Sequence, residues 1–329
     1  MKAAIVDQPN AKFRIVDVDR PTPPPGEVLV RILASGVNPL DTKIRAGQAA
    51  HARQPLPAVL GLDMAGVVES VGSAVTKFHP GDEVYGMVGG VGGLQGTLAE
   101  YAAVDARLLA RKPANLTMRQ AAALPLATIT AWEGLVDRAH VRAGQKVLIH
   151  AGAGGVGHIA VQVALCFGAQ VFATVSANKR DYVEQLGAIP IDYRTQSVES
   201  YVHDATGGEG FDIVYDTVGG ATLDASFTSV KQYTGHVLSA LGWGTHSLAP
   251  LSFRGASYSG VFTLHPLLTG DGREHHGEIL AEAARLAEAG RLVPLLNETI
   301  YSFETLEEAH AAVASGQSMG KVVVKISGR

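Results

Sequence analysis

Hydrophobic and polar positions follow two different patterns along this chain, and the change falls near residue 117. From residue 2 to about residue 122, short apolar or alternating runs such as Glu27–Leu33 and Leu98–Val104 are separated by glycine and proline. Runs of this kind predict short strands, so this part is expected to be rich in β-structure. The stretch Val88–Gly96 is too rich in glycine for a regular element and is expected to be a mobile loop.

The second pattern alternates strands with helices. Met118–Val136 has helical spacing with a break at Pro125. A short buried strand is then predicted from Lys146, because Val147 to Ile149 and Ala151 are apolar. Such alternation predicts a parallel sheet covered by helices on both faces. The tail is expected to rejoin the first domain. Further strands are predicted at 170–175, 211–216, 235–241, 258–263, 298–303 and 321–326, and helices at 278–290 and 304–314.

One turn in the second part has the spacing G-x-G-x-x-G. Gly152, Gly154 and Gly157 lie between the strand at Lys146–Ile149 and the helical pattern that follows. Glycine allows a tight turn, a close approach of the backbone to a pyrophosphate and close packing of helix on strand. The turn therefore predicts dinucleotide binding, and the alternative is a structural turn without a ligand. The backbone of the turn would contact the phosphates at Gly152, Ala153, Gly154, Gly155, Val156 and Gly157.

Composition narrows the class of protein. The chain has 329 residues, of which 47% are hydrophobic and 18% charged, and its net charge is −4. This balance gives no electrostatic attraction to nucleic acid or anionic membrane, so neither partner is expected. The single cysteine cannot form an internal disulfide. Charge appears too early for a signal peptide, and no apolar run of about 18 residues occurs, so a cytoplasmic protein is predicted.

Five motifs carry a family resemblance that spans essentially the whole chain. They are Gly36–Thr42, Gly61–Val68, His79–Gly86, Ala122–Pro125 and His150–Gly157. In this order they resemble the medium-chain dehydrogenase/reductase superfamily, and within it the zinc-independent quinone oxidoreductase branch, which includes zeta-crystallin. The resemblance implies an α/β fold with a GroES-like β-rich domain, residues 1–122 completed by 266–329, and a Rossmann domain with a doubly wound parallel sheet, residues 123–265.

Ligands for zinc are lacking in the sequence. A structural zinc needs about four ligands, usually cysteines, and a catalytic zinc needs about three from cysteine, histidine and carboxylate. This chain has one cysteine. At positions where zinc alcohol dehydrogenases place a cysteine and a Gly-His-Glu motif, it has Asn38 and Gly61-Leu-Asp63. No metal site is predicted.

The end of the second predicted strand indicates which nicotinamide cofactor binds. NAD sites usually place a carboxylate there, and NADP sites place cations. Here the strand ends at Ser176, Lys179 and Arg180 follow, and Asp181 lies inside the next helical pattern. This arrangement favours NADPH, with a solvated helix start as the alternative for the two cations. The resemblance places Ser176, Lys179 and Tyr193 around the 2′-phosphate, and Val218, Leu241 and Phe262 as cofactor contacts at strand ends.

The chemistry implied is hydride transfer to a quinone or an α,β-unsaturated carbonyl. Negative charge then develops on oxygen, and hydrogen-bond donors suffice to stabilise it. Candidate donors are Asn38, Thr130 and Lys43, of which Asn38 and Thr130 match family positions near the nicotinamide. Lys43 stands where the family often has tyrosine, and it either lines the pocket or points to solvent.

The sequence is compatible with two functions of different classes. The first is an NADPH-dependent reductase of quinones or enones, with an enoyl-thioester reductase as the alternative activity. The second is a nicotinamide-nucleotide-binding protein without catalysis, of a crystallin-like or regulatory kind. A homodimer is the family expectation, and the last sheet strand, Tyr258–Thr263, is a candidate edge for pairing.

Overall fold

The computed structural model describes residues 1–316 and 318–326 and divides into two compact units. The first unit contains residues 1–129 and the described residues from 264 onward, and the second contains residues 130–263. The first is rich in antiparallel strands and the second is built on a parallel sheet. The predicted α/β class is therefore confirmed, and the described tail belongs to the first unit.

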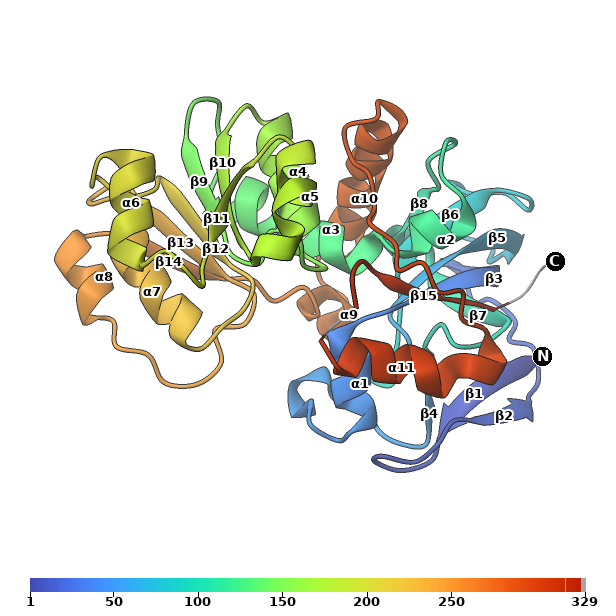
Figure 1. Ribbon diagram of the computed structural model, residues 1–329. Coiled ribbons are helices and arrows are strands. Elements are labelled where there is room, and N and C mark those ends of the chain that lie inside the picture. The colour runs from blue at the N-terminus through green and yellow to red at the C-terminus, as the bar shows by residue number, and fades with distance from the viewer. Residues whose placement is uncertain (317, 327–329) are drawn as a thin grey trace. The chain divides into compact units, whose positions relative to one another are not determined.

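Two antiparallel sheets form the first unit (Figure 1). The glycine and proline punctuation of the sequence falls at their turns, where residues such as Gly26 and Gly81 have positive φ angles of 86° and 95°. The smaller sheet has the order β2 (Arg14–Asp17), β1 (Lys2–Val6), β4 (Ala58–Val59). The larger has the order β15 (Val322–Lys325), β3 (Glu27–Val37), β5 (Asp63–Val71), β6 (Glu83–Met87), β8 (Leu109–Arg111), and β7 (Tyr101–Asp105) also pairs with β3.

Strand β3 is the centre of the larger sheet because it pairs along both of its edges. Its first half pairs with β7, its second half pairs with β15, and β5 lies along its other side. Figure 1 shows the C-terminal strand β15 beside this N-terminal strand. In register, Gly36 faces Asp63 of β5 and Val37 faces Val322 of β15. The ends of three strands that are far apart in sequence therefore lie together.

Short helices connect these strands. One long helix follows the point, at residue 264, where the chain re-enters the first unit. The long helix α10 (Arg273–Glu288) begins five residues earlier than the predicted helix at Glu278, and the Tyr85 hydroxyl donates to its Leu280 carbonyl at 2.5 Å. The other helical segments are α1 (Pro39–Arg45), η1 (Ala50–Ala52), η2 (Ala106–Leu108), α2 (Met118–Ala122), α9 (His265–Thr269), η5 (Phe303–Thr305) and α11 (Leu306–Ala314).

The predicted strand at 298–303 is wrong. Only Tyr301 reaches a neighbouring strand, where it forms an isolated bridge with Val324. Backbone carbonyls of this segment bind a side chain. The Arg119 guanidinium donates to the carbonyl of Thr299 at 2.7 Å and to the carbonyl of Asn297. Within the predicted strand, the Thr299 carbonyl is thus satisfied by a side chain in place of a strand partner.

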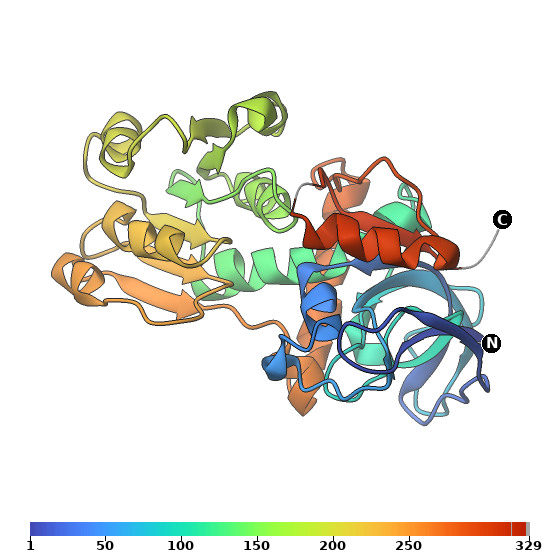
Figure 2. The same cartoon turned by 60° about the horizontal axis from the view of Figure 1, so that its bottom comes forward.

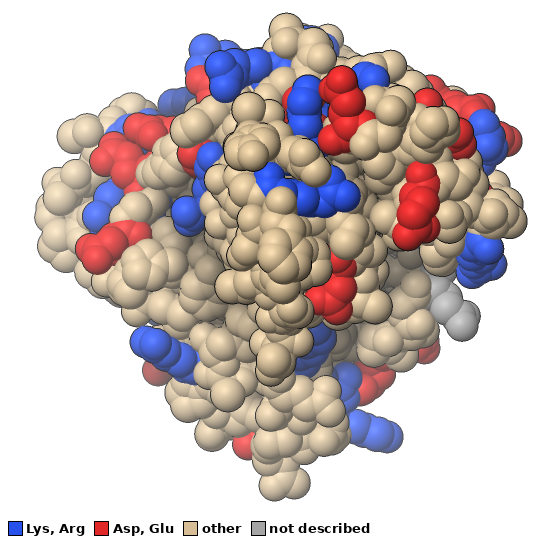
Figure 3. All heavy atoms as spheres, turned by 90° about the vertical axis from the view of Figure 1, so that its left-hand side faces the viewer, with Lys and Arg blue, Asp and Glu red and all other residues tan. Residues whose placement is uncertain are grey.

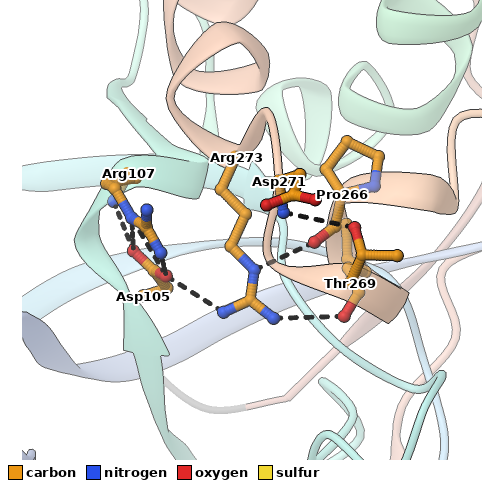
Figure 4. Close-up of polar contacts among 7 residues, drawn as sticks. Asp105, Arg107, Pro266, Thr269, Asp271 and Arg273 are labelled. Atoms are coloured by element: carbon orange, nitrogen blue, oxygen red, sulfur yellow. Dashed lines mark hydrogen bonds and ion pairs between the residues drawn. The ribbon is translucent and has the colours of Figure 1, made fainter.

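An arginine holds the returning segment to the sheet (Figure 4). Arg273, the first residue of α10, donates to Asp105 at the end of β7 at 3.0 Å and to the carbonyls of Pro266 and Leu267 at 3.0 and 3.1 Å. Arg107 donates to the same carboxylate. Burial alone would raise the pKa of Asp105, but the hydrogen bonds from Arg107 and Arg273 outweigh it and hold the pKa below its usual range.

We expect Arg273→Met to lower the free energy of unfolding by about 2 kcal/mol, because a partly buried carboxylate and two carbonyls lose a charged donor. Arg107→Met is the matched control, since its side chain is 53% exposed, and it should cost less than about 1 kcal/mol. The lowered pKa of Asp105 means that its stabilisation is lost as the pH falls through that pKa. Urea unfolding at neutral and acid pH measures both effects, and equal losses for the two variants would contradict the assignment.

The second unit contains one parallel sheet of six strands with helices on both faces (Figures 1 and 2). Helices α4 (Gly157–Cys166) and α5 (Arg180–Gln185) contact the strands β9 (Lys146–Ile149), β10 (Gln170–Val175) and β11 (Ile189–Asp192). Helix α7 (Ala221–Ser229) contacts β12 (Ile213–Asp216) and β13 (His236–Ser239). The strand order is β11 (Ile189–Asp192), β10 (Gln170–Val175), β9 (Lys146–Ile149), β12 (Ile213–Asp216), β13 (His236–Ser239), β14 (Ser257–Gly260). The helical segments are α4 (Gly157–Cys166), η4 (Ala177–Lys179), α5 (Arg180–Gln185), α6 (Val198–Thr206), α7 (Ala221–Ser229) and α8 (Ala249–Arg254).

The helical stretch predicted at Met118–Val136 consists of three pieces. Helix α2 ends before Pro125, α3 (Pro125–Trp132) begins at that proline, and a π-helix (Glu133–Arg138) follows directly. In the second unit, a Cβ on Gly134 would lie 2.7 Å from the ring of Tyr215. The buried Tyr215 hydroxyl donates to the Thr130 carbonyl at 2.6 Å. The Tyr215 side chain therefore packs against the π-helix and hydrogen-bonds a carbonyl just before the start of that helix.

The charged surface agrees with the small net charge. On the face drawn in Figure 3, acidic and basic side chains are scattered among a larger area of other residues. Among the helices that the structure describes, none is both long and apolar enough to cross a membrane.

Candidate active site

The glycine turn lies where the sequence predicts it, between β9 and α4. The Gly152 N–H donates to the carbonyl of Thr174 on β10 at 3.0 Å, and a Cβ on Gly152 would lie 2.5 Å from the Ala173 Cβ. A Cβ on Gly157 would overlap the carbonyl oxygen of Ala151. Two of the three glycines therefore serve close packing of strand and helix.

The remaining part of the turn is open. A Cβ on Gly154 would lie 3.0 Å from the Ala151 oxygen, and Gly155 is exposed. Within the described part of the chain, the N–H groups of Gly155 and Val156 have no recorded acceptor. Ala153 is buried beside them. Unsatisfied N–H groups at the start of a ten-residue helix suit a pyrophosphate.

The predicted 2′-phosphate residues lie at the ends of two adjacent strands. Val175 of β10 is in register with Asp192 of β11, so Ser176 and Tyr193 each follow the last paired residue of their strand. Tyr193 is 54% exposed. Lys179 ends the short helix η4 and has no recorded ion pair among the residues described. No carboxylate stands at the end of β10.

The structure separates the two cations that the sequence left equivalent. The Arg180 guanidinium donates to Glu184, one turn further along α5, at 2.9 Å. Arg180 is therefore paired on the surface of α5, whereas Lys179 has no recorded ion pair among the described residues.

Two polar residues near this strand end were missed by the sequence analysis. The Ser176 hydroxyl donates to Asn178 Oδ1 at 2.6 Å. The Arg194 guanidinium lies over the Tyr193 ring, 5.7 Å from its centroid, which adds a second cation at this edge. The signal was present for Arg194, since it follows the tyrosine directly in a polar turn.

The residues predicted at the other strand ends also lie on this edge. Val218 follows β12 and is 49% exposed, and a Cβ on Gly219 would lie 2.6 Å from the Leu241 carbonyl oxygen, so the two loops touch. Asp216 holds this arrangement, because its carboxylate accepts from the Val218 N–H at 3.0 Å and from the Ser239 hydroxyl at 2.7 Å.

Phe262 follows β14 and packs edge-on against Trp243, with ring centroids 6.3 Å apart. Phe262 is 37% exposed and Trp243 is 50% exposed. The tryptophan was not predicted as a site residue. Trp243 lies in the loop after β13, and only the fold brings this loop to the end of β14.

His150 is buried directly before the glycine turn. Its Nδ1 lies 3.3 Å from the Thr174 hydroxyl, and its Nε2 has no partner among the described residues. Burial lowers the pKa of His150 to about 4, although Asp216 acts in the opposite direction. The imidazole is therefore neutral at pH 7.

We expect His150 to make the protein less stable in acid. Because its folded pKa lies below that of the unfolded chain, stability is lost as the pH falls from about 6.5 toward 4, by up to about 3 kcal/mol. His150→Gln should lack this part of the pH dependence in urea unfolding, whereas His203→Gln, at an exposed histidine, should keep it. Parallel stability curves for the parent and His150→Gln would contradict the expectation.

The predicted donors in the first unit have opposite environments. Asn38, directly after β3, is 1% exposed, and its amide Nδ2 donates to Asp63 at 2.9 Å. Its Oδ1 accepts from the Lys321 ammonium. Lys43 on α1 is exposed, and together with burial its charge lowers the pKa of His51. Lys321 and the role of Asp63 were missed, because Lys321 lies 283 residues from Asn38.

Thr130, the predicted donor in the second unit, lies in α3 and is 5% exposed. Its carbonyl is held by Tyr215.

The Val88–Gly96 segment has no regular element, as predicted, but it is packed rather than free. Val88 and Val91 are 3% and 0% exposed. The Gly92 N–H donates to the Ala52 carbonyl at 2.9 Å, and the Gly93 N–H donates to Gln54 at 2.9 Å. The expectation of a mobile loop is therefore corrected: buried valines anchor a chain whose glycines only permit its turns.

The donors around Asn38 do not fit a zinc ion. The Asn38 oxygen already accepts from an ammonium, and Lys321 Nζ lies 3.9 Å from Asp63 Oδ2. A divalent cation beside a buried ammonium would be repelled. No group of three or more histidine, cysteine or carboxylate side chains suited to a metal occurs among the residues described.

An open glycine turn at a helix start, on the edge where parallel strands end, defines a dinucleotide-binding protein. Two family models match the chain: "Alcohol dehydrogenase GroES-like domain" over residues 24–114 and "Zinc-binding dehydrogenase" over residues 186–324. The chain is 37% identical over 306 residues to the 2-methylene-furan-3-one reductase of Solanum lycopersicum, which covers 91% of this chain and 71% of that protein.

Two further comparisons agree. The chloroplastic NADPH-dependent alkenal/one oxidoreductase of Arabidopsis thaliana is 36% identical over 306 residues, covering 91% of this chain and 72% of that protein. A solved alcohol dehydrogenase superfamily protein from Novosphingobium aromaticivorans is 56% identical, with a TM-score of 0.97 and coverage of 99% of this chain and 100% of that one. The chain belongs to the medium-chain dehydrogenase/reductase superfamily, in its zinc-independent quinone oxidoreductase branch.

Proposed function

We propose that this protein is a zinc-independent, NADPH-dependent reductase that transfers hydride to a quinone or an α,β-unsaturated carbonyl compound. The observation that carries the proposal is the edge of the second unit, where an open glycine turn is joined by Lys179 and Arg194 without a carboxylate at the strand end. The relatives named 2-methylene-furan-3-one reductase and NADPH-dependent alkenal/one oxidoreductase support the same acceptor class.

Bound NADPH supplies the hydride in this chemistry. The protein must stabilise the negative charge that develops on the acceptor oxygen, as an enolate or a phenolate. Neutral donors are suited to this task, and we assign it to the Asn38 amide and the Thr130 hydroxyl.

Activity is tested by the loss of absorbance at 340 nm with NADPH and a panel of quinones, 2-alkenals, cyclic enones and a 2-enoyl thioester. We expect turnover with quinones or enones, unchanged by EDTA. Tight NADPH binding without turnover of any acceptor would instead favour the non-catalytic, crystallin-like function. Turnover restricted to the thioester would identify an enoyl-thioester reductase.

Lys43 is proposed to lie beside the acceptor and to attract anionic substituents, since it is exposed and close enough to His51 to lower the pKa of that imidazole. Lys43→Ala should raise KM about tenfold for an acceptor that carries a carboxylate, because one charged contact is lost. KM for a neutral enone should change less than about twofold. Equal KM values for Lys43→Ala and the parent with every acceptor would refute this role.

We also infer a cytoplasmic homodimer that pairs through β14. This strand has a hydrogen-bonded neighbour, β13, on one side only. Its Tyr258 is 38% exposed. An unpaired edge is a template for a second strand, and a two-fold axis would join two edges. Sedimentation at micromolar concentration should give a dimer. The N–H groups of Ser257 and Val261 donate to β13 and the residue directly before it, so those of Tyr258 and Gly260 lie on the free edge, and Gly260→Pro should give a monomer. A monomeric parent protein would refute the inference.

A further inference from the structure

A histidine in the second unit contacts two groups that can only accept hydrogen bonds. His246 lies in the loop of residues 240–248 between β13 and α8, which we call the 240–248 loop (Figure 1). Its Nδ1 lies 2.8 Å from a carboxylate oxygen of Asp224 on α7, and its Nε2 lies 3.3 Å from the carbonyl oxygen of Trp243. The imidazole ring therefore connects helix α7 to the backbone of its own loop.

This pair of partners specifies the charge of the His246 ring. A neutral imidazole has one N–H donor and one acceptor nitrogen, whereas the imidazolium has two donors. A carboxylate and a carbonyl both accept, so only the imidazolium can bind Asp224 and the Trp243 carbonyl at once. The hydrogen bond to Asp224 raises the pKa of His246 above its ordinary value, and the hydrogen bond to the carbonyl acts in the same direction.

The other groups around His246 are acidic, neutral or apolar. The charge of Asp216, at the end of β12, also raises the pKa of His246. Tyr258 of β14 lies against the same loop, because a Cβ on Gly242 would overlap its hydroxyl, and burial raises the pKa of that hydroxyl. The His246 ring packs edge-on against Phe227 of α7, with centroids 6.4 Å apart. These surroundings favour the imidazolium and contain no second group that titrates in the same pH range.

The 240–248 loop carries residues at the edge where the cofactor is proposed to bind. Leu241 lies near its start, and the Leu241 N–H donates to the Ser239 hydroxyl at 3.1 Å. Trp243 packs edge-on against Phe262, which follows β14. Both Leu241 and Phe262 are proposed cofactor contacts, so Trp243 stands beside them at the carboxyl ends of β13 and β14.

The backbone on both sides of Trp243 is glycine. Gly242 precedes it, and Gly244 follows it with a φ of 104°. Glycine gives a chain more conformational freedom than any other residue. A hydrogen bond to the Trp243 carbonyl therefore restricts a segment that its own sequence leaves easy to move.

Loss of the ring proton removes one of the two hydrogen bonds. The bond to the carboxylate is the stronger, so a neutral ring keeps its proton on Nδ1 and releases the Trp243 carbonyl. Because the folded pKa of His246 is raised, both bonds are present below the ordinary histidine pKa of about 6.5, and the second is lost as the pH rises through the folded value.

We propose that His246 is a positioning residue for the nicotinamide cofactor: its charged ring holds the 240–248 loop against α7 and so keeps Leu241 and Trp243 at the cofactor-binding edge. His246 acts through these two residues rather than by contact with the cofactor. This inference rests on the NADPH binding of the proposed function, so its first test uses protein without cofactor.

The first readout is the accessibility of Trp243 to solvent. The chain has two tryptophans, so Trp132→Phe leaves Trp243 as the only one. In this background, without cofactor, we expect the rate constant for acrylamide quenching, measured from fluorescence lifetimes, to rise at least twofold between about pH 6 and about pH 9. Adding His246→Gln should make the rate constant independent of pH. Adding His203→Gln, at an exposed histidine of α6, should leave the parent's pH dependence intact.

Asp224→Asn provides a second variant with a signed expectation. Its side chain is 55% exposed, whereas that of His246 is 12% exposed, so the substitution changes the charge beside the ring with little effect on packing. Because the carboxylate raises the pKa of His246, its removal should move the pH at which Trp243 becomes accessible to a lower value. An unchanged midpoint would contradict the pairing of these two side chains.

The second readout is the affinity for NADPH by calorimetric titration. We expect Kd to be about fivefold higher at about pH 9 than at about pH 7, because a charge-assisted hydrogen bond that orders the site is lost. The 2′-phosphate has a second pKa of about 6 and keeps its charge over this range. In His246→Gln, Kd should change less than about twofold over the same range, and in His203→Gln it should follow the parent.

The outcomes separate this inference from the proposed function. Quenching of Trp243 that does not depend on pH, or that keeps its pH dependence in His246→Gln, would overturn the positioning role while NADPH binding stands. Quenching that depends on His246, combined with the same pH profile of Kd in the parent and His246→Gln, would overturn the link between the loop and the cofactor. A parent protein that binds no NADPH at any pH would overturn the proposed function and, with it, the role of His246 in cofactor binding.

Discussion

Lys179→Glu should raise KM for NADPH about 100-fold and leave KM for NADH within about threefold, because the two cofactors differ only in the 2′-phosphate. In the structure, Lys179 is the cation at the end of β10 that lacks an ion pair among the described residues. The substitution removes a charge-assisted contact and adds a repulsive carboxylate at the position where NAD-binding proteins often carry one. Initial rates with each cofactor at a fixed acceptor concentration measure the change.

Arg180→Glu is the matched control for this experiment. The Arg180 guanidinium is already paired with Glu184 on the surface of α5, so reversing its charge should alter KM for NADPH less than about fivefold. Arg194→Ala should give an intermediate loss, because its guanidinium lies over the Tyr193 ring at the same edge. An equal effect of Lys179→Glu on both cofactors would contradict the assignment of the 2′-phosphate site.

Substitutions at two glycines of the turn should affect the stability of the protein and its affinity for NADPH to different extents. Gly157→Ala places a Cβ against the Ala151 carbonyl, so we expect a loss of about 2–3 kcal/mol in the free energy of unfolding as well as weaker NADPH binding. Gly154→Ala has more room, with its nearest neighbour, the same carbonyl oxygen, at 3.0 Å. It should cost less than about 1 kcal/mol in stability but weaken NADPH binding about 10- to 100-fold, because the Cβ occupies the approach of the pyrophosphate.

Urea unfolding and calorimetric titration with NADPH measure these two quantities on the same preparations. Gly144→Ala in the loop before β9 is a control, since a Cβ there meets no atom within 4 Å, although its φ of 83° adds backbone strain. It should weaken folding without altering the affinity for NADPH. Equal losses of affinity and stability in Gly154→Ala would mean that this glycine serves packing alone.

Much of the fold could be predicted because its signals are local. The strand at Gln170–Val175 has the predicted bounds, and Lys146–Ile149 begins where its apolar run begins. Strand β11 was not predicted, since its Ile189 and Pro190 are partly exposed at the sheet edge and show little apolar pattern. The π-helix after Trp132 also escaped prediction, because helical spacing does not distinguish its wider turn, which packs against a distant tyrosine.

The boundaries between the units also depend on packing that the sequence pattern does not show. The sequence analysis divides the chain at 122/123 and 265/266, whereas the compact units divide it at 129/130 and 263/264. Pro125 at the start of α3 marks a break in the sequence pattern. The helix, however, continues past the division between the units. Which residues of a continuous helix belong to which unit depends on tertiary packing, and the sequence pattern carries no sign of it.

The candidate site was predicted where chemistry follows a local motif, as in the glycine turn and the strand end at Ser176. The roles of Lys321 and Asp63 depend instead on the pairing of β3 with β5 and β15. A lysine directly before the apolar run of β15 could have raised the question, because unpaired burial of an ammonium is costly. Its partner could not be named without the register of the sheet.

The pairing of β15 with β3 also has a consequence for the order of events during synthesis. The first unit begins to emerge from the ribosome before the second, yet its central strand lacks one neighbour until residues 322–325 have been made. The second unit is continuous in sequence and is complete at residue 263. Because domains fold as units as they emerge, the nucleotide-binding unit should reach its native state first. Lys321, whose ammonium donates to the Asn38 side chain, is made only near the end of translation.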